Sequence, residues 1–546
     1  MSDTQQLIPL FYLKVNGQQA RAELTADVES ITVESSLHMP DVATITLHDH
    51  ELRWTDSDEL APGKPIVVSA KVKQAEKPVF DGEVVEIEPV LEKGMKKLVV
   101  RAFDRLHRLA RGRCARRFVN VSDGDLVQKI AGEVGLQAKV GPTPDVHAYV
   151  IQANETNLSF LQGRAAALGY LLYVTEKTLH CEAPGARGET IELEWEKSLS
   201  EFRPRMSTIG QLNEVTVRGW DPAQRREIVG QADASQIQPK IGEQKSGGDV
   251  AQQAFRVAAR YLVTDRPLQS QSLADKLARA IADRHAGRFI EAEGACEGNP
   301  AIVAGAQVEI KNVGQRFGGT YFITGATHRF GPGVYETRFS VSGLQPATLL
   351  SFLAPEADQA IPPGLAIGIV TDNNDPQKLG RVKVKFPWLA GDVDSDWVRV
   401  VSVGGGKERG IAFLPEVNDE VLLGFELGDF NHPYVLGGLW NGQDKPAAPA
   451  SGSYPVGSGK VQERVIRSRA GHTITLDDSD GGGGITIQDS KGNKIVLDSG
   501  SNALKVEVKG NLTLEAKGQI EIKGQGIKID AGAATVDVKG STINLN

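Results

Sequence analysis

The chain has 546 residues and a formal net charge of −8, with 59 glycines and an aromatic content of 6%. This length allows three or four domains, and the acidic balance gives no general attraction to nucleic acid or to an anionic membrane. The start lacks a basic stretch followed by an apolar core, and no run of eighteen apolar residues occurs. We therefore predict a protein made in the cytoplasm without a signal peptide or stable membrane insertion.

Residues 1–200 are predicted to form a first β-barrel domain with a helical insert. Alternating apolar residues favour strands in FYLKV, SITVESS, ATITLHDH, PIVVSAKV, VFDGEVVEIEPV and KKLVVRAFD. A helix is predicted over Ser122–Val134, where the serine can cap the first turn and apolar residues form one stripe. A second helix is predicted over Asn157–Leu168, with Gly169 as its end.

Residues 201–345 are predicted to form a second β-barrel domain, interrupted by a polar, glycine-containing stretch at 233–249 and holding a helix over Ser272–His285. The first domain reads PGKPIVVSAKV, FDGEVVEIEPV and KKLVVRAFD, and the second reads AGAQVEIKNV, FGGTYFITGATHRF and YETRFSVSG. Both follow the order glycine turn, strand, F-x-G, strand, turn, strand, which indicates two copies of one barrel plan. Three such chains would give a ring of six similar units that could dock on a six-fold partner.

A connector at 346–364 leads to a third unit at 365–442. Its five strand signals, LAIGIVT, LGRVKVKF, DWVRVVS, EVLLGFEL and PYVLGGLW, suit a small barrel of the OB type. Residues 443–484 begin with a stretch rich in Gly, Ser, Pro and Ala, which is typical of a linker, and are predicted to end with the start of the repeat-containing needle.

Residues 485–546 contain the clearest repeat in the chain. Blocks such as NLTLEAKG and QIEIKGQG end in glycine, and apolar residues alternate with polar ones between the glycines. Alternation with period two predicts strands of four or five residues, with turns where glycine is favoured. The apolar residues predicted to face one common axis are Ile485, Ile487, Leu512, Leu514, Ile520, Ile522, Ile527, Ile529, Val536, Val538, Ile543 and Leu545.

One ribbon of these strands cannot bury its apolar face by itself. Each strand offers about two apolar side chains, worth roughly 1.5 to 3 kcal/mol apiece when fully buried, while the opposite face carries Lys, Glu and Asp. Three identical chains winding around one axis, with strands pairing between chains, would cover this face. We therefore predict an intertwined triple-stranded β-helix and a homotrimer. A single-chain β-solenoid is the alternative, although blocks of eight residues are short for a coil with three faces.

The OB region carries the most specific motifs. DPQKLGRVKVKFPW at 375–388, followed by FLPEVNDEVLLGFELGDFNHPYVLGGLWNG at 413–442, resembles the OB domain of the VgrG family, the spike proteins of contractile injection systems. NETNLSFLQGRAAALGYLLYV at 154–174 is similar to a segment of the hub domain of the same family, and the repeat resembles the triple-stranded β-helix of the spike. Related proteins are the phage baseplate hub and cell-puncturing spike. Asn418 departs from the family pattern, which often has Gly there.

The resemblance implies a mainly β protein without its own enzyme activity or cofactor: a hub of two barrels, an OB collar and a needle. Its implied partners are an inner tube protein, baseplate proteins, a PAAR-like tip protein on Ile543, Asn544, Leu545 and Asn546, and effector cargo. The N-terminus lacks the L-S-x-L-F-x-Y opening of type VI secretion members, which favours a released, phage-tail-like particle acting outside the producing cell. A phage tail spike and a type VI secretion VgrG are the alternatives.

Two further patterns imitate ligand sites. Gly404–Lys407 suggests a phosphate loop, but Glu408 replaces the Ser or Thr that would hold magnesium, so a strand connection is favoured. Asp477, Asp478 and Asp480 lack the spacing and closing Glu of a calcium loop, which favours a turn.

Histidine and cysteine usage also argues against a metal site. His48 and His50 are predicted to share one strand face, without a third ligand nearby in the sequence. Three cysteines, odd in number and far apart, predict reduced thiols and no disulfide framework or thiolate site: Cys114, Cys181 and Cys296.

Arg381, Lys383 and Lys385 alternate along the second predicted OB strand, a position where this fold often binds oligonucleotides or sugars. No aromatic residues are interleaved for stacking on bases, which favours a solvated face or a contact with a neighbouring chain. A carbohydrate-binding adhesin using this face and an envelope-degrading enzyme are the rival functions. The enzyme would need a hydrolase domain, and the linker is too short to hold one.

Overall fold

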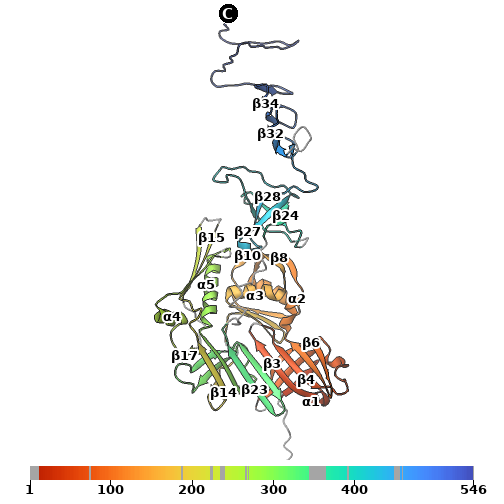
Figure 1. Ribbon diagram of the computed structural model, residues 1–546, viewed down its shortest axis with the longest axis vertical. Helices are drawn as coiled ribbons and strands as arrows, with labels where there is room; N and C mark the ends of the chain where they lie inside the picture. Colours follow the sequence, from red (N-terminus) through yellow and green to blue (C-terminus); the bar gives the residue numbers. More distant parts are fainter. Residues whose placement is uncertain are drawn as a thin grey trace, which may run out of the picture. The chain divides into compact units, whose positions relative to one another are not determined.

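The computed structural model describes residues 11–37, 39–72, 75–185, 188–221, 226–233, 240–264, 267–268, 270–343, 364–389, 393–447, 456–457 and 459–544. The chain forms two compact units, residues 1–439 and 440–546. The regular secondary structure of both is mainly β-strand (Figure 1). Across the described ranges, no helix has the length and apolar character needed to cross a bilayer.

The first barrel region consists of short antiparallel strands around an apolar core that includes Trp54 and Phe80. Its elements are β1 (Phe11–Val15), β2 (Gln18–Gln19), α1 (Ala22–Asp27), β3 (Val28–Ser36), β4 (Val42–His48), a 3-10 turn (Asp58–Leu60), β5 (Pro65–Val72), β6 (Ala75–Glu92) and β7 (Met95–Phe103). Apolar residues alternate along β3 and β4, so that one face enters the core and the other faces solvent.

The second barrel region has its own core, in which Tyr321 and Phe339 are buried. Its elements are β13 (Ile191–Glu194), β14 (Leu199–Met206), β17 (Lys240–Ile241), β19 (Ile290–Glu297), β20 (Gln307–Lys311), β21 (Gly319–Phe322), β22 (Gly325–Gly331) and β23 (Val334–Val341). Strands β13, β20, β21 and β17 form one sheet, and the remaining strands join a much larger one.

That larger sheet has eleven strands in the order β14-β19-β23-β22-β3-β4-β7-β6-β5-β1-β2. The first region contributes the run β3-β4-β7-β6-β5 to this sheet, and the second contributes the run β14-β19-β23-β22. In the second region, the order continues after β22 with the separate pair of strands β21 and β20. The long β6 thus takes the place of β21 and β22 together. This repeated strand order agrees with the duplication inferred from the sequence. The direct pairing of β22 with β3, which makes the two copies one sheet, was not predicted.

His328 lies in β22 at the junction between the copies, opposite Val33 of β3 and Thr337 of β23. Its side chain is fully buried, and its Nδ1 lies 3.0 Å from the Tyr335 hydroxyl and 3.1 Å from the Thr337 hydroxyl. Burial disfavours the imidazolium and lowers the pKa of His328 to about 4. The neutral ring is therefore part of the folded state.

Acid is expected to weaken the eleven-stranded sheet through His328. The folded pKa is lowered, so the stabilisation is complete above about pH 6.5 and is lost as the pH falls through about 4, at about 1.4 kcal/mol per pH unit. His328→Asn, which can keep the hydrogen bonds made at Nδ1, should flatten the fall of the unfolding free energy in this window. Urea unfolding at a series of pH values measures it. The exposed His50→Asn serves as control, and equal slopes in the wild type and His328→Asn would contradict the assignment.

The first insert contains both helices predicted in this part of the chain. Its elements are a 3-10 turn (Arg105–Ala110), β8 (Cys114–Ser122), α2 (Asp123–Glu133), β9 (Gln137–Val140), β10 (Val146–Glu155), α3 (Asn157–Leu168), β11 (Leu171–Thr175) and β12 (Thr178–Glu182). Ser122 and Asp125 form a reciprocal capping box that starts α2. Gly169 ends α3 with a φ of 70°, a left-handed conformation that glycine adopts without strain.

The second insert pairs a three-stranded sheet with a long helix. Its elements are β15 (Glu214–Asp221), β16 (Arg226–Asp233), α4 (Gly247–Phe255), β18 (Arg260–Val263) and α5 (Gln271–Ala286). The helix α5 confirms the prediction for residues 272–285. In contrast, α4 was not predicted, because its first turn consists of two glycines inside a polar stretch. Ser246 caps this helix by accepting a hydrogen bond from the amide of Asp249.

Residues 366–438 form a closed five-stranded barrel, as the five strand signals predicted. Its elements are β24 (Ala366–Asp372), β25 (Arg381–Lys385), β26 (Val398–Val400), β27 (Glu420–Phe425), a 3-10 turn (Glu426–Gly428) and β28 (Pro433–Gly438), in the order β24-β25-β26-β28-β27. Two residues of β10, Tyr149 and Ile151, belong to the apolar core of this barrel. The Tyr149 hydroxyl donates a hydrogen bond to the Asp394 carbonyl, so the first insert packs directly against the barrel.

The second unit begins with short strands and continues as an antiparallel meander. Its elements are β29 (Val456–Gly457), β30 (Lys460–Val461), β31 (Glu463–Arg467), β32 (Thr473–Asp477), β33 (Gly484–Gln488), β34 (Lys494–Asp498) and β35 (Ala503–Glu507) (Figure 1). Strands β31 to β35 form one sheet in sequence order. Residues 508–544 are described and carry no strand in this single chain.

Candidate functional site

The sheet β31–β35 carries a continuous apolar face. Ile474 of β32 lies opposite Ile487 of β33, which lies opposite Ile495 of β34 and then Val506 of β35. A parallel row runs through four further residues: Leu476, Ile485, Leu497 and Leu504. All of these side chains are exposed in the single chain. An exposed apolar face of this extent marks an interaction surface.

The predicted axis residues continue this pattern beyond the sheet. From Ile485 to Ile543, every one of them within the described ranges is exposed, and Ile522 exposes 66% of its surface. Leu545 and Asn546 lie outside the described residues. Strands were predicted between the glycines of 508–544, but a strand needs a hydrogen-bonded neighbour, which the single chain does not supply there.

The rest of the apolar rows was missed in the sequence. Ile474 and Leu476 lie within 443–484, which was predicted to hold the linker and the start of the needle, and they were not included among the axis residues. Their blocks are joined by irregular turns rather than by regularly spaced glycines. Four residues inside the predicted repeat were also left out, although they alternate with polar residues: Ile495, Leu497, Leu504 and Val506.

The face opposite the apolar rows carries ion pairs near the ends of its strands. Lys494 contacts Glu507 at 2.9 Å, and further along the chain Lys523 contacts Glu521 at 2.6 Å. These partly or fully exposed pairs are screened by solvent and contribute little stability. Across β31 to β34, the centre of this face is uncharged and consists of Val465, Thr475, Thr486 and Val496.

The D-P-x-x-x-G-R motif closes the loop before β25. The carboxylate of Asp375 accepts hydrogen bonds from the amides of Gln377 and Leu379 at 3.0 and 2.8 Å. It also pairs with the guanidinium of Arg381 at 2.8 Å. The hydrogen bond from Arg381 is the main reason why the pKa of Asp375 lies far below its usual value. Arg381 is therefore committed to loop structure and is not a free ligand-binding cation.

The P-E-V-x-D motif forms the turn before β27. Asp419 accepts a hydrogen bond from the Glu416 amide at 2.7 Å, and the Asn418 amide donates to the Val370 carbonyl at 2.8 Å. Asn418 has a φ of 77°, in the left-handed region. This conformation is one that glycine adopts without strain and that Asn tolerates better than most other residues.

Asn418→Ala is expected to destabilise the OB barrel by about 1 kcal/mol, because alanine is strained at positive φ. Asn418→Gly should be neutral or slightly stabilising. Thermal unfolding of the two variants beside the wild type measures the difference. Equal losses for both would show that the Asn418 side chain, rather than its backbone conformation, matters.

The N-E-T motif of the hub starts α3. Asn154 has a φ of 54° beside a bulge in the β8–β10 pairing, and the Thr156 side chain caps the helix by accepting from the Ser159 amide. The following Phe160 and Leu161 are buried in the core of the insert. The motif thus lies at a β-bulge, caps α3 and precedes two core residues, which is a structural role.

The patterns that imitate ligand sites are also structural. Gly404–Lys407 lies in an exposed hairpin, and Lys383 stacks over Trp397 at 5.1 Å. The rings of His48 and His50 stack at 5.9 Å on one face, as predicted. Among the described residues, no group of three His, Cys, Asp or Glu could hold a metal ion.

The described cysteines and the acidic turn at 477–480 are structural as well. All three cysteines are free thiols, and burial raises the pKa of Cys181 and of Cys296 to about 12. In the acidic turn, Asp477 accepts from the Ser479 amide at 2.9 Å, and Asp478 pairs with Arg464.

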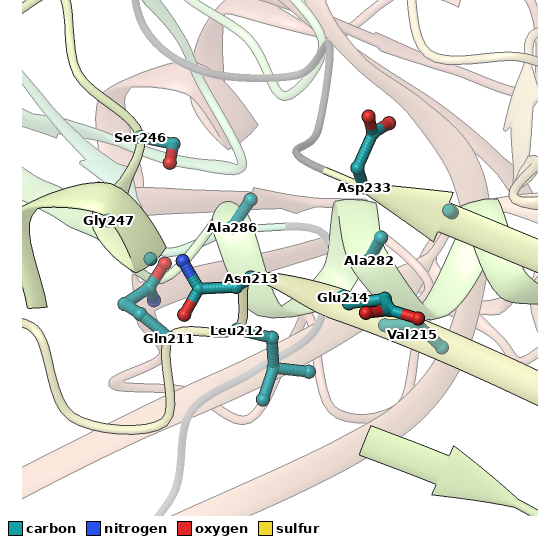
Figure 2. A pocket seen from close by; sticks show the side chains of 12 residues that line it. Gln211, Leu212, Asn213, Glu214, Val215, Asp233, Ser246, Gly247, Ala282 and Ala286 are labelled. Carbon is teal, nitrogen blue, oxygen red and sulfur yellow. The ribbon is translucent and has the colours of Figure 1, made fainter. Parts of the chain in front are cut away.

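A pocket in the second insert is lined by polar groups that already serve the fold (Figure 2). Gln211 donates to the His285 carbonyl at 2.7 Å, and Asn213 donates to Gln252 at 2.9 Å. A Cβ on Gly248 would lie 2.2 Å from the Leu212 carbonyl oxygen, so the start of α4 touches the neighbouring backbone. The pocket is therefore a narrow gap where α4 packs closely against the backbone before β15.

Three family models match this chain. Residues 5–331, more than half of the chain, match the Alg8 N-terminal domain. Residues 366–440 match the type VI secretion system/phage-baseplate injector OB domain. Residues 463–546 match the phage baseplate V C-terminal trimerisation domain. The last two matches cover the closed barrel and the sheet with the apolar face.

Curated relatives and solved structures agree with these matches. The type VI secretion system spike protein VgrG5 of Pseudomonas aeruginosa is 34% identical over 127 residues, which are 22% of this chain and 14% of that protein. VgrG1a of the same organism is 28% identical over 139 residues, and these cover 22% of each protein. The chain therefore spans less than a quarter of the length of these curated relatives.

A solved Francisella PdpA-VgrG complex has the same fold, with a TM-score of 0.55 at 9% identity over 91% of this chain and 80% of that one. The Escherichia coli c3393 protein is a type VI secretion component with structural similarity to the phage T4 tail proteins gp27 and gp5. It matches with a TM-score of 0.51 at 16% identity, over 78% of this chain and 99% of that one. With hub, OB barrel and trimerisation domain in this order, the chain belongs to the family of the Alg8 N-terminal domain and is a VgrG-like spike protein.

Proposed function

We propose that this protein is the homotrimeric central spike and hub of a contractile injection system. The observation that carries the proposal is the uncovered apolar face of β31–β35, which continues in the exposed alternating residues up to Ile543. The match of the same segment to a trimerisation domain supports three chains as the covering arrangement. The residues at the axis of the trimer are then those predicted from the repeat.

The hub adapts the three-fold spike to a six-fold tube and baseplate. Support comes from the repeated strand order in the eleven-stranded sheet, which gives each chain two similar halves. Three chains present six such halves in a ring. Inner tube and baseplate proteins are the partners expected at this ring.

The needle acts mechanically. Contraction of a surrounding sheath drives it through the target envelope, while interchain strand pairing and a dry axis resist unfolding. The particle is phage-tail-like and acts outside the cell that makes it; a phage tail spike or a type VI secretion VgrG, each with the same mechanical role, are the alternatives. A carbohydrate-binding adhesin is a rival of a different class, and a glycan array distinguishes it.

A PAAR-like tip protein is proposed to sit on residues 543–546, of which Ile543 is exposed in the single chain. Deleting residues 544–546 is then expected to abolish capture of the tip protein without changing the mass of the spike. Pull-down of the tip protein made by the same gene cluster tests this. Unchanged capture by the shortened spike would place the tip elsewhere.

The mass of the full-length protein in solution tests the central proposal. Light scattering is expected to give three times the chain mass of 58.7 kDa. A folded monomer would remove the basis for the needle and for the ring.

A further inference from the structure

The OB barrel carries a projecting arm formed by residues 401–414. It leaves the barrel after β26, where the Val401 amide donates to the Val435 carbonyl of β28 at 2.9 Å. Farther out, the Ile411 amide donates to the Val403 carbonyl at 3.1 Å, and the Ser402 hydroxyl donates to the Ile411 carbonyl at 2.6 Å. The arm is thus a hydrogen-bonded hairpin with a defined shape.

The arm carries uncovered apolar side chains on both sides of a charged tip, Lys407–Arg409. All residues from 401 to 414 are exposed. Val403 exposes 73% of its surface and Phe413 exposes 64%. The large apolar side chains on the arm are Val401, Val403, Ile411, Phe413 and Leu414. Scattered exposed apolar residues are ordinary, but five within one hairpin indicate a contact surface.

The same barrel has a second uncovered apolar surface, the outer face of β24, β27 and β28. Ile367 of β24 lies directly opposite Leu422 of β27. Leu436 of β28 lies beside Gly424 of β27, 3.3 Å from the position of a Cβ there. Ile367 and Leu436 are both exposed. Trp388 borders this face, because its indole nitrogen donates to the Ile367 carbonyl at 2.9 Å.

We propose that the arm of one chain docks on this outer face of the OB barrel in the next copy of the chain. Each chain carries one arm and one face, both apolar, and both are uncovered in the single chain. The trimerisation segment at 463–546 follows the barrel in the same polypeptide, which holds neighbouring barrels at high effective concentration. The inference rests on the proposed homotrimer and assigns a second interface to it.

The arrangement is head-to-tail. Arm and face are different surfaces, so the contact does not pair a surface with its own copy, and a head-to-tail contact closes into a ring when the rotation between neighbours matches the number of chains. In a trimer, three arms bind three faces and none is left over. The contact between OB barrels would thus hold the three chains together independently of the needle.

Thiol cross-linking of the full-length protein tests the arrangement. Phe413→Cys on the arm and Leu436→Cys on the face are combined in a Cys114→Ser background, because the two remaining cysteines are buried. A short bismaleimide should convert most of the double variant into covalent trimers on a denaturing gel. Each single-thiol variant can give at most dimers. Replacing the face thiol by Lys385→Cys, on β25, should reduce linking to the background level.

The possible outcomes separate the two proposals. A trimer by light scattering that yields no covalent trimers, or only internally linked monomers, overturns the arm contact and leaves the needle trimer intact. A monomer by light scattering removes both. Linking of the arm thiol to a different protein in assembled particles would also overturn the proposal, because it assigns the arm to another copy of this chain.

Discussion

Ile522→Asp is expected to convert the trimeric spike into monomers. Ile522 is 66% exposed in the single chain and is placed at the needle axis in the proposed trimer. The substitution would set three carboxylates around one axis. At a separation of about 4 Å and an effective dielectric constant of about 20, each pair of like charges costs about 4 kcal/mol. This exceeds the roughly 1.5 to 3 kcal/mol that each buried isoleucine contributes.

The neighbouring residue supplies a matched control. Lys523 lies on the opposite face of the ribbon, pairs with Glu521 and is exposed. Lys523→Asp changes the charge by more than Ile522→Asp does, yet the trimer should persist because the new carboxylate stays in water. Sedimentation velocity distinguishes the species. If Ile522→Asp remains trimeric, the assignment of these residues to the axis is wrong.

Tyr149→Ala is expected to loosen the OB barrel from the hub and to destabilise it by about 3 to 5 kcal/mol, the usual cost of removing a buried aromatic side chain. The Tyr149 ring lies in the barrel core, although the residue belongs to β10 of the first insert. The β8–β10 pair is tied to the barrel twice more. The Ile151 amide of β10 donates to Asn431 at 2.7 Å, and Arg117 of β8 pairs with Asp394.

Hydrogen exchange of the barrel strands measures this coupling, since exchange in β24–β28 should accelerate in Tyr149→Ala. Tyr149→Phe removes only the hydroxyl that donates to Asp394 and should cost about 1 kcal/mol. Val146→Ala, at an exposed position on the same strand, should have no effect. Unchanged exchange in Tyr149→Ala would mean that the barrel holds its place by other contacts.

Local patterns in the sequence predicted much of the fold. The helices α2, α3 and α5 have apolar stripes and end signals within their own residues, and the five OB strands alternate clearly. The duplication was also visible, because both copies keep the same order of turns. The pairing of β22 with β3 and the docking of Tyr149 were not predicted, since neither leaves a periodic signal near the residues involved.

The candidate site was predicted in part. The alternation between glycines identified the residues from Ile485 to Ile543 as one apolar series, and their trimeric arrangement remains a prediction. The predicted axis set left out six members of the two rows. Ile474 and Leu476 precede the regularly spaced glycines, whereas Ile495, Leu497, Leu504 and Val506 lie within the repeat and alternate in the same way. The role of Asp375 was hidden for another reason: a carboxylate that binds backbone amides looks, in a sequence, like any other acidic residue.

The continuous sheet through β22 and β3 has a consequence for dividing the protein. Cutting the chain between its two halves would expose β22 and β3 as edge strands. Their unpaired amides and carbonyls could then pair with other chains and lead to aggregation. Separately expressed halves should therefore precipitate or recombine with each other. A reporter or cargo inserted into a surface loop of either half would keep the β22–β3 pairing intact and is the better way to label the hub.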